Sequence, residues 1–259
     1  MRSRIELTHL TLASPRVLSA ERLLILADLH QQAREEYEER WLALSPTAVL
    51  IPGDWIEGRE GRSGRAQALS LLRRLAEYCP VFYSLGNHEL GLHGNRLPLG
   101  EGRQATSPKT ARCASELTDC GVQLLCDGYI RWHSLCIGGL TPACGRMLSN
   151  AWLKNMASED GFRLLLCHHP EYYEPYVRRY GLDLTVSGHA HGGQWRLFGR
   201  GIYAPGQGLF PRYTSGFYDE KHLLVSRGLA ERYPVPRIFN TKQAILLELL
   251  PEQNRERKI

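Results

Sequence analysis

Short and nearly continuous apolar runs recur along this chain, and each run ends in a polar loop. Runs of this length and composition are typical of strands that are buried on both faces of a sheet. The pattern therefore predicts an α/β fold in which the sheets are covered on both sides. The five clearest runs are Arg22–Ala27, Ala48–Ile51, Val81–Leu85, Arg163–Cys167 and Leu182–Ser187.

Helical patterns separate several of these runs. The segments Gln31–Leu44 and Arg65–Cys79 each keep their apolar residues on one helical face. A third helix is indicated by Ser107 as N-cap, Pro108 in the first turn and Gly121 as the stop signal. The chain therefore alternates strands with helices through its first half.

Further strands are predicted in the second half of the chain, with Asp127-Gly128 as a hairpin turn between the first two. They are Val122–Cys126, Tyr129–Trp132, Leu135–Leu140, Gly201–Ala204, His222–Ser226 and Ala244–Leu249. Strand-helix alternation followed by hairpins predicts a four-layer αββα sandwich, in which two mixed sheets pack face to face and helices lie outside. Because the sequence has no linker or repeat, we expect one domain over residues 1–259, with a core at 22–250 and a polar tail at 251–259.

Composition limits the functional class. With 43% hydrophobic and 23% charged residues, the 259-residue chain has the composition of a soluble globular protein. A net charge of +5 is too small to indicate nucleic-acid binding. The seven cysteines include no C-x-x-C pair, which favours reduced thiols of the cytoplasm. Met1–Ala20 has no long apolar core, and no run approaches the roughly 20 apolar residues of a membrane span. We therefore expect a soluble, cytoplasmic protein.

The loops that follow the five apolar runs carry carboxylate, amide and imidazole side chains. In open α/β sheets, ligands bind at the carboxyl edge of the strands, where such loops converge. Asp54 follows Gly53 at a point from which one carboxylate could bridge two cations. Oxygen and imidazole ligands without thiolate favour Mn, Fe, Co, Ni or Zn. The loops read Asp28-Leu29-His30, Gly53-Asp54, Gly86-Asn87-His88-Glu89, His168 and Gly188-His189-Ala190-His191.

In this order and spacing, these loops resemble the motifs of the calcineurin-like metallophosphoesterase family. The resemblance runs from about Leu23 to Leu249. The stretch from Gly188 to Gln194, together with Val225-Ser226-Arg227-Gly228-Leu229, is similar to the YkuE-like bacterial branch of that family. That branch includes enzymes that cleave the pyrophosphate of a UDP-linked lipid precursor.

The resemblance implies two divalent metal ions, with manganese as the first choice. One ion would be held by Asp28, His30, Asp54 and His191. The other would be held by Asp54, Asn87, His168 and His189, with His169 as a second candidate for the position of His168. The implied catalytic residues are Asn87 and His88, and His88 would contact the phosphate and protonate the leaving oxygen.

The resulting functional prediction is hydrolysis of a phosphodiester or pyrophosphate bond, by in-line attack of a hydroxide that bridges the two metals. The expected substrate is a small molecule or a lipid-linked phosphate ester, which leaves peripheral membrane contact open. A phosphomonoesterase or a protein phosphatase is the alternative enzyme. A nuclease is disfavoured, since no basic stripe is interleaved with aromatic residues. A metal-free scaffold is disfavoured because none of the ligands is missing.

Three secondary interpretations concern residues beside these motifs. Glu89 is expected to orient its turn. Three arginines after Asp54 either contact a substrate phosphate or lie on a solvated loop: Arg59, Arg62 and Arg65. Three aromatic residues in the Gly- and Pro-rich stretch 203–218 could form the rim of a pocket for an apolar group or a nucleobase: Phe210, Tyr213 and Phe217.

Overall fold

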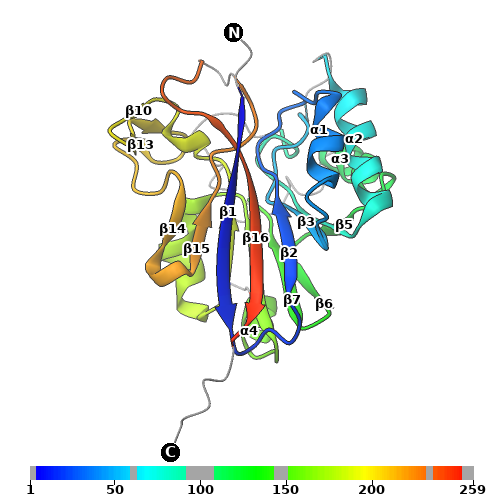
Figure 1. The fold of residues 1–259 in the computed structure, drawn as a ribbon, viewed down its shortest axis with the longest axis vertical. Helices are drawn as coiled ribbons and strands as arrows, with labels where there is room; N and C mark the ends of the chain where they lie inside the picture. Colours follow the sequence, from blue (N-terminus) through cyan, green and yellow to red (C-terminus); the bar gives the residue numbers. More distant parts are fainter. Residues whose placement is uncertain (1–3, 59–62, 92–107, 143–150, 232–235, 253–259) are drawn as a thin grey trace, which may run out of the picture.

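Two six-stranded mixed sheets pack face to face in the computed structural model, which describes residues 4–58, 63–91, 108–142, 151–231 and 236–252 (Figure 1). The first sheet has the order β1 (Ile5–Ser14), β16 (Lys242–Pro251), β2 (Glu21–Ile25), β3 (Ala48–Ile51), β4 (Val81–Ser84), β5 (Gln123–Leu125). The second has the order β14 (Gly216–Tyr218), β15 (Leu223–Val225), β9 (Leu184–Ser187), β8 (Phe162–Cys167), β7 (Leu135–Leu140), β6 (Gly128–Trp132).

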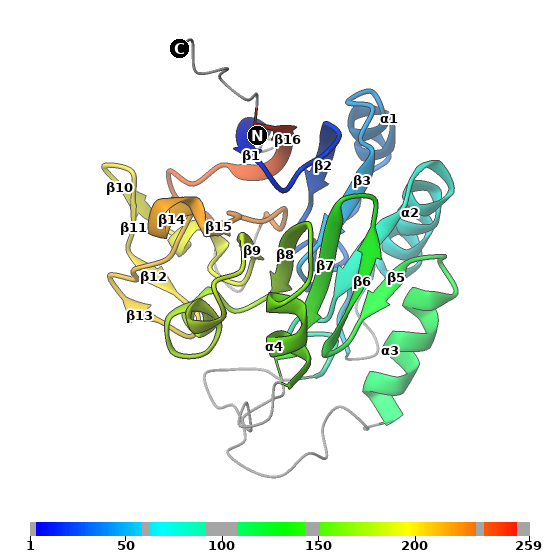
Figure 2. The ribbon, with the colours of Figure 1, turned by 90° about the horizontal axis from the view of Figure 1, so that it is seen from below.

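Helices cover the outer face of each sheet (Figure 2). The first sheet is covered by α1 (Glu36–Leu42), α2 (Arg65–Tyr78) and α3 (Pro108–Thr118), and the second by α4 (Ala151–Ala157) and short turns over Pro170–Tyr172, Tyr173–Val177 and Arg178–Tyr180. Three apolar layers result: one between the sheets and one under each set of helices. The predicted four-layer αββα sandwich is therefore confirmed.

Strand β2 shows why the runs are apolar at every position. Leu24 contributes to the layer under the helices, whereas Leu23 and Ile25 contribute to the layer between the sheets. Successive side chains of a strand point to opposite faces. Because both faces of this sheet are buried, neither face tolerates polar residues, and the sequence shows no alternation.

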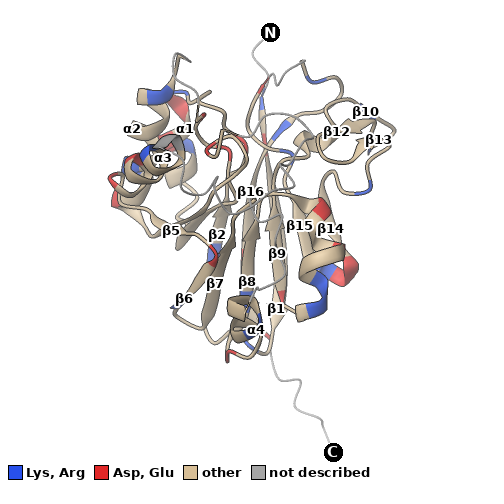
Figure 3. Ribbon diagram, turned by 180° about the vertical axis from the view of Figure 1, so that it is seen from behind, with Lys and Arg blue, Asp and Glu red and all other residues tan. Residues whose placement is uncertain are grey.

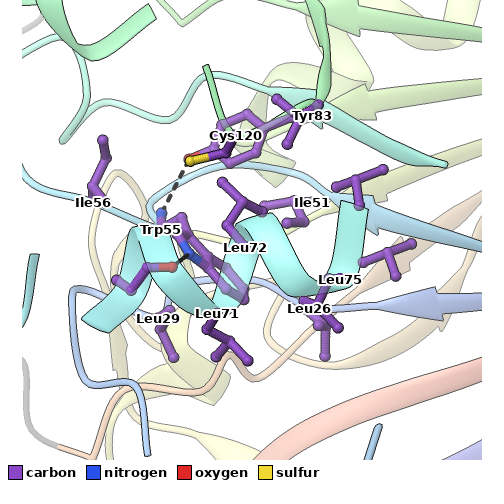
Figure 4. Packing of buried hydrophobic residues seen from close by; sticks show 14 of the residues in the cluster. Leu26, Leu29, Ile51, Trp55, Ile56, Leu71, Leu72, Leu75, Tyr83 and Cys120 are labelled. Carbon is purple, nitrogen blue, oxygen red and sulfur yellow. Dashed lines mark hydrogen bonds between the residues drawn. The ribbon is translucent and has the colours of Figure 1, made fainter. Parts of the chain in front are cut away.

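Trp55 anchors the loop that follows β3. It is fully buried beneath α2 beside Leu71 and Leu72 (Figure 4). Its indole Nε1 donates a hydrogen bond to the carbonyl oxygen of Ala68 at 2.9 Å. Burying a large side chain stabilises the fold by about 2–3 kcal/mol, so the residue next to Asp54 is held rigidly.

Two of the predicted elements are wrong in detail. Helix α1 begins at Glu36, because Gln31 has a left-handed backbone with φ 61° and belongs to the loop after β2. Asp127-Gly128 is not a hairpin turn, since β5 pairs with β4 in the first sheet whereas β6 pairs with β7 in the second. The chain crosses between sheets here, and the hairpin lies at the next connection. Ser107, the predicted N-cap, lies outside the described residues.

The N-terminal strand β1 is missing from the sequence prediction. It pairs in parallel with β16 from Ile5 opposite Lys242 to Ser14 opposite Pro251, at the edge of the first sheet. Its residues are mostly half-buried or exposed, so it lacks the apolar run that marks the inner strands.

Other predictions concern the chain as a whole. Within the described residues, the cysteines are free thiols and no helix combines the length and apolarity that a bilayer span requires. Strand β16 extends to Pro251, and the predicted tail from residue 253 lies outside the description. The single-domain organisation stays a prediction.

Candidate metal centre

The predicted site residues come together at the carboxyl edge of the strands. Asp28 and His30 follow β2, Asp54 follows β3, Asn87 and His88 follow β4, His168 follows β8, and His189 and His191 follow β9. All eight side chains are buried, with exposed fractions between 0% and 7%. Several loops thus deliver carboxylate, amide and imidazole groups into one interior region.

Five of these residues have a left-handed backbone: Asp28 (φ 53°), His30 (φ 48°), Asp54 (φ 56°), His189 (φ 63°) and His191 (φ 47°). For a residue other than glycine, this conformation costs about 1–3 kcal/mol and persists only where the surroundings enforce it. Such strain clusters at functional sites. The fold therefore holds these five residues in an unfavourable backbone conformation that directs their side chains toward one region.

The first group of ligand-type atoms consists of Asp28, His30 and His191. The Nε2 atoms of His30 and His191 face each other at 3.3 Å, and His191 Nε2 lies 3.9 Å from Asp28 Oδ1. The other carboxylate oxygen of Asp28, Oδ2, is buried without a hydrogen-bond partner. Two imidazole nitrogens and a buried carboxylate at this spacing can hold a divalent cation.

The second group centres on His168. Its Nδ1 lies 2.7 Å from the carbonyl oxygen of Pro52, which can only accept, so Nδ1 carries the proton. Its Nε2 then faces two further acceptors, Asp54 Oδ2 at 3.0 Å and Asn87 Oδ1 at 3.1 Å. Burial opposes protonation, but the Asp54 carboxylate outweighs it and raises the pKa of His168 to about 10. This cluster of acceptors requires a cation, which is either a proton or a metal ion.

Asp54 connects the two groups. Its Oδ2 lies 3.0 Å from His168 Nε2 and 3.7 Å from His30 Nε2, and its Oδ1 accepts a hydrogen bond from the His88 amide at 2.9 Å. Gly86 permits this close approach, since a Cβ atom there would lie only 2.1 Å from Asp54 Oδ1. One carboxylate thus faces both imidazole groups.

His189 and the neighbouring His169 complete the second side of the centre. The ring of His189 lies 5.0 Å from that of His168 and 3.9 Å from that of His169, measured between centroids. His169 turns its Nδ1 toward Glu171 Oε1 at 2.9 Å, and a ligand-type nitrogen of His169 lies within 4.8 Å of those of His168 and His189. Its Nε2 is buried without a partner. The structure therefore places His168, the first choice of the two, against the central carboxylate.

The two histidines from the loop after β9 are suited to be neutral ligands. Burial, followed by the neighbouring imidazoles His169 and His30 respectively, holds the pKa of His189 and that of His191 well below the usual value. Both rings therefore keep a lone pair available near neutral pH.

Glu57 is a site residue that the sequence analysis missed. Its fully buried carboxylate accepts hydrogen bonds from His30 Nδ1 at 2.9 Å and from His88 Nδ1 at 2.8 Å. Burial disfavours the charged form, yet these two histidines lower the pKa of Glu57 strongly. The bonds orient Nε2 of both rings toward Asp54. The only signal in the sequence is a carboxylate three residues after Asp54, which is common in polar loops.

Glu89 organises the two loops that carry Asp54 and Asn87. Its carboxylate accepts hydrogen bonds from several backbone amides and from the Tyr83 hydroxyl at 2.5 Å. The amide donors are those of Asp54 (3.0 Å), Trp55 (2.7 Å), Ile56 (3.1 Å) and Gly86 (2.8 Å). The expected role of Glu89 in orienting its turn is confirmed, and it extends to the neighbouring loop.

Replacing Glu89 with glutamine should destabilise the whole fold. The amide NH₂ of glutamine would face backbone N–H donors that now share a carboxylate, leaving buried donors unsatisfied. We expect the free energy of unfolding to fall by about 2–4 kcal/mol, and the melting temperature to fall by about 5–15 °C. Thermal unfolding followed by circular dichroism measures this. Glu77→Gln, on the exposed side of α2, is the matched control; equal melting temperatures for the two variants would contradict the role.

The three arginines and the three aromatic residues named in the sequence analysis do not form common groups in the described part of the structure. Arg65 donates to the carbonyl oxygen of Glu57 and pairs with Glu116, so it supports the loop. Arg59 and Arg62 lie outside the described residues. The expectation of one aromatic rim is wrong, because Tyr213 is buried and Phe217 packs against the layer between the sheets, whereas Phe210 is exposed.

Comparison with known proteins shows the family. The sequence model of the family described as calcineurin-like phosphoesterase matches residues 21–193, more than half of the chain. The chain belongs to the calcineurin-like phosphoesterase family, and this places it among the hydrolases of phosphate esters.

Relatives are found at modest identity. The phosphodiesterase YaeI of Escherichia coli is 28% identical over 259 aligned residues, covering 88% of this chain and 82% of YaeI. The uncharacterised metallophosphoesterase YkuE of Bacillus subtilis is 28% identical over 218 aligned residues, covering 81% of this chain and 69% of YkuE. The uncharacterised Bacillus subtilis protein YpbG is 25% identical over 208 aligned residues, covering 80% of this chain and 72% of YpbG. The resemblance seen in the motifs is confirmed by these relatives.

Among solved structures, TT1561 of Thermus thermophilus matches with a TM-score of 0.43 and 12% identity, covering 66% of this chain and 82% of TT1561. The cold-active protein-tyrosine phosphatase of a Shewanella species matches with a TM-score of 0.39 and 12% identity, covering 86% of this chain and 74% of the phosphatase.

Proposed function

We propose that this protein is a dinuclear metal-dependent phosphoesterase that hydrolyses a phosphodiester or pyrophosphate bond. The observation that carries the proposal is the position of Asp54 Oδ2, which lies 3.0 Å from Nε2 of His168 and 3.7 Å from Nε2 of His30. A carboxylate in this position suits two adjacent cations. The diester preference is supported by the relative YaeI, which is named a phosphodiesterase.

The donor set fits two divalent ions. Asp28, His30, Asp54 and His191 would hold one ion, and Asp54, Asn87, His168 and His189 the other. Oxygen and imidazole donors without thiolate suit manganese, our first proposal, as well as Fe, Zn, Co or Ni. When bound, such ions supply Lewis acidity and lower the pKa of a water to roughly 7.

His88 is the residue that we propose to handle the leaving group. Its Nδ1 donates to Glu57, so the reactive Nε2 is directed into the centre, 3.9 Å from Asp54 Oδ2. Burial lowers the pKa of His88, but the carboxylates of Asp54 and Glu57 outweigh burial and raise it above the usual value. A protonated Nε2 can contact a phosphate oxygen and give its proton to the leaving oxygen.

The proposed substrate class rests on the resemblance to the YkuE-like branch of the family. We propose a small-molecule or lipid-linked phosphate ester, met in the cytoplasm. The net charge of +5 is too small to indicate nucleic-acid binding, so a nuclease is not proposed.

The test compares two chromogenic substrates. Purified protein supplemented with Mn²⁺ should hydrolyse bis-p-nitrophenyl phosphate at least about tenfold faster than p-nitrophenyl phosphate, a difference of 1.36 kcal/mol in barrier. EDTA should remove both activities, and Mn²⁺ should restore them. Faster hydrolysis of the monoester would make the protein a phosphomonoesterase instead. Activity that is unaffected by EDTA would overturn the metal-dependent mechanism.

A further inference from the structure

Three phenylalanines are almost fully exposed at turns. Phe198 is 96%, Phe210 81% and Phe239 85% exposed, and they are half of the six phenylalanines in the chain. Each has a left-handed backbone, with φ of 48°, 53° and 51° respectively. This conformation is unfavourable for a bulky residue, so the fold holds three aromatic side chains outward at a conformational cost.

The three turns lie on neighbouring segments that backbone hydrogen bonds join. The region has two small hairpins, β10 (Arg196–Leu197) with β11 (Arg200–Gly201), and β12 (Tyr203–Ala204) with β13 (Gly208–Leu209) (Figure 2). The segment 236–239 joins β10, since the Arg196 amide donates to the Ile238 carbonyl at 3.0 Å. Phe210 joins through its amide, which donates to the Ile202 carbonyl at 2.8 Å. We call this the phenylalanine surface; its exposed members are Leu197, Phe198, Leu209, Phe210, Ile238 and Phe239.

The chain segment that forms the two hairpins carries charge of one sign. Residues 190–218 contain no aspartate or glutamate, but they contain Arg196, Arg200 and Arg212. Figure 3 shows Lys and Arg segments on the loops around β10, β12 and β13. Arg200 and Arg212 are exposed, and Arg212 also lies 3.7 Å from the carboxylate of Glu174 at the border of the surface. An apolar surface with exposed arginines at its border complements a surface that is apolar inside and anionic outside.

The phenylalanine surface is continuous with the metal centre. The side-chain Nδ2 of Asn240 donates hydrogen bonds to the backbone carbonyl oxygens of His191, at 2.7 Å, and of Gln194, at 3.1 Å. Gln194 in turn accepts from the Ile238 amide at 3.4 Å. The turn that carries a candidate metal ligand is therefore bonded directly to the segment that carries Phe239.

We propose that the phenylalanine surface docks this protein onto an anionic lipid bilayer. Aromatic side chains on separate turns can enter the interfacial region individually, where aromatic rings are favoured. The neighbouring arginines can contact anionic headgroups. A bilayer fits better than a protein partner, because the phenylalanines project singly from turns. Membrane binding itself does not depend on the proposed function. The further step, in which docking brings a lipid-linked phosphate ester to the metal centre, rests on the proposed function.

Vesicle sedimentation tests the proposal. The full chain should sediment with phosphatidylcholine vesicles that contain phosphatidylglycerol, and much less with phosphatidylcholine alone. The triple variant Phe198→Ser, Phe210→Ser, Phe239→Ser should lower the bound fraction by at least about tenfold. Arg200→Glu with Arg212→Glu should weaken binding to the anionic vesicles. Leu18→Ser, which removes an 81% exposed apolar side chain away from this surface, should bind like the wild type.

A second measurement separates docking from folding and catalysis. The triple variant should hydrolyse soluble bis-p-nitrophenyl phosphate at the wild-type rate. If the wild type does not bind the anionic vesicles, or if the triple variant binds equally well, the proposal is wrong. It is also overturned if light scattering shows a wild-type dimer that the triple variant loses, since a second copy would then occupy the surface. Vesicle binding without phosphodiester hydrolysis would refute the proposed function and leave the docking intact.

Discussion

Replacing Asp54 with asparagine should eliminate turnover and weaken the binding of both metal ions. Asparagine keeps Oδ1, which accepts the hydrogen bond from the His88 amide at 2.9 Å, so the loops should stay in place. It replaces the charged Oδ2, which faces His168 and His30, with a neutral NH₂ group that cannot bind a cation. Loss of several kcal/mol of charge stabilisation corresponds to a decrease in kcat of about 10³-fold or more.

Two measurements check this result. Elemental analysis should find substantially less bound metal in Asp54→Asn than in the wild type after both are loaded with Mn²⁺, and hydrolysis of bis-p-nitrophenyl phosphate should be near background. Asp119→Asn removes the same charge at an exposed position and should behave like the wild type. Wild-type metal content in Asp54→Asn would show that Asp54 is not shared between two ions.

Replacing His88 with alanine should lower kcat by about 10²–10³-fold, the usual contribution of a positioned general acid with its phosphate contact. Metal content should change little, because His88 Nε2 lies 3.9 Å from Asp54 Oδ2 and belongs to the cluster with His30 and Glu57, outside both proposed ligand sets. The decrease should be smaller for a substrate whose leaving group is a good one, since such a group needs less protonation.

The comparison therefore uses two diesters that differ in the acidity of the leaving alcohol, together with elemental analysis. His9→Ala, at an exposed position of β1, is the matched control. Substantial metal loss in His88→Ala would show that His88 is a ligand. An equal rate decrease for both leaving groups would contradict its role as a proton donor.

Much of the fold could be predicted because the inner strands are buried on both faces. A run such as Ala48–Ile51 has no polar position, and a fully buried strand leaves the same signature in the sequence. Edge strand β1 lacks this signature and was missed. The connection at Asp127 was misread because a turn between paired strands and a crossing between two sheets use the same turn residues.

The candidate site was also predictable for a physical reason. Each ligand-type residue directly follows a strand, so the direction of the chain sets the edge at which it emerges. Glu57 escaped notice because its importance lies in two hydrogen bonds to rings from other loops. Such partners are adjacent only in space.

By itself, the sequence determined the layered α/β class, the family resemblance and the identity of the ligand-type side chains, because these depend on local polarity and on order along the chain. Only the tertiary structure decided that His168 and not His169 faces Asp54, and that Glu57 holds two imidazole rings. It also decided that three phenylalanines are exposed on segments that lie side by side. These features depend on the packing of segments that are far apart in sequence, and residue order does not record the distances between them.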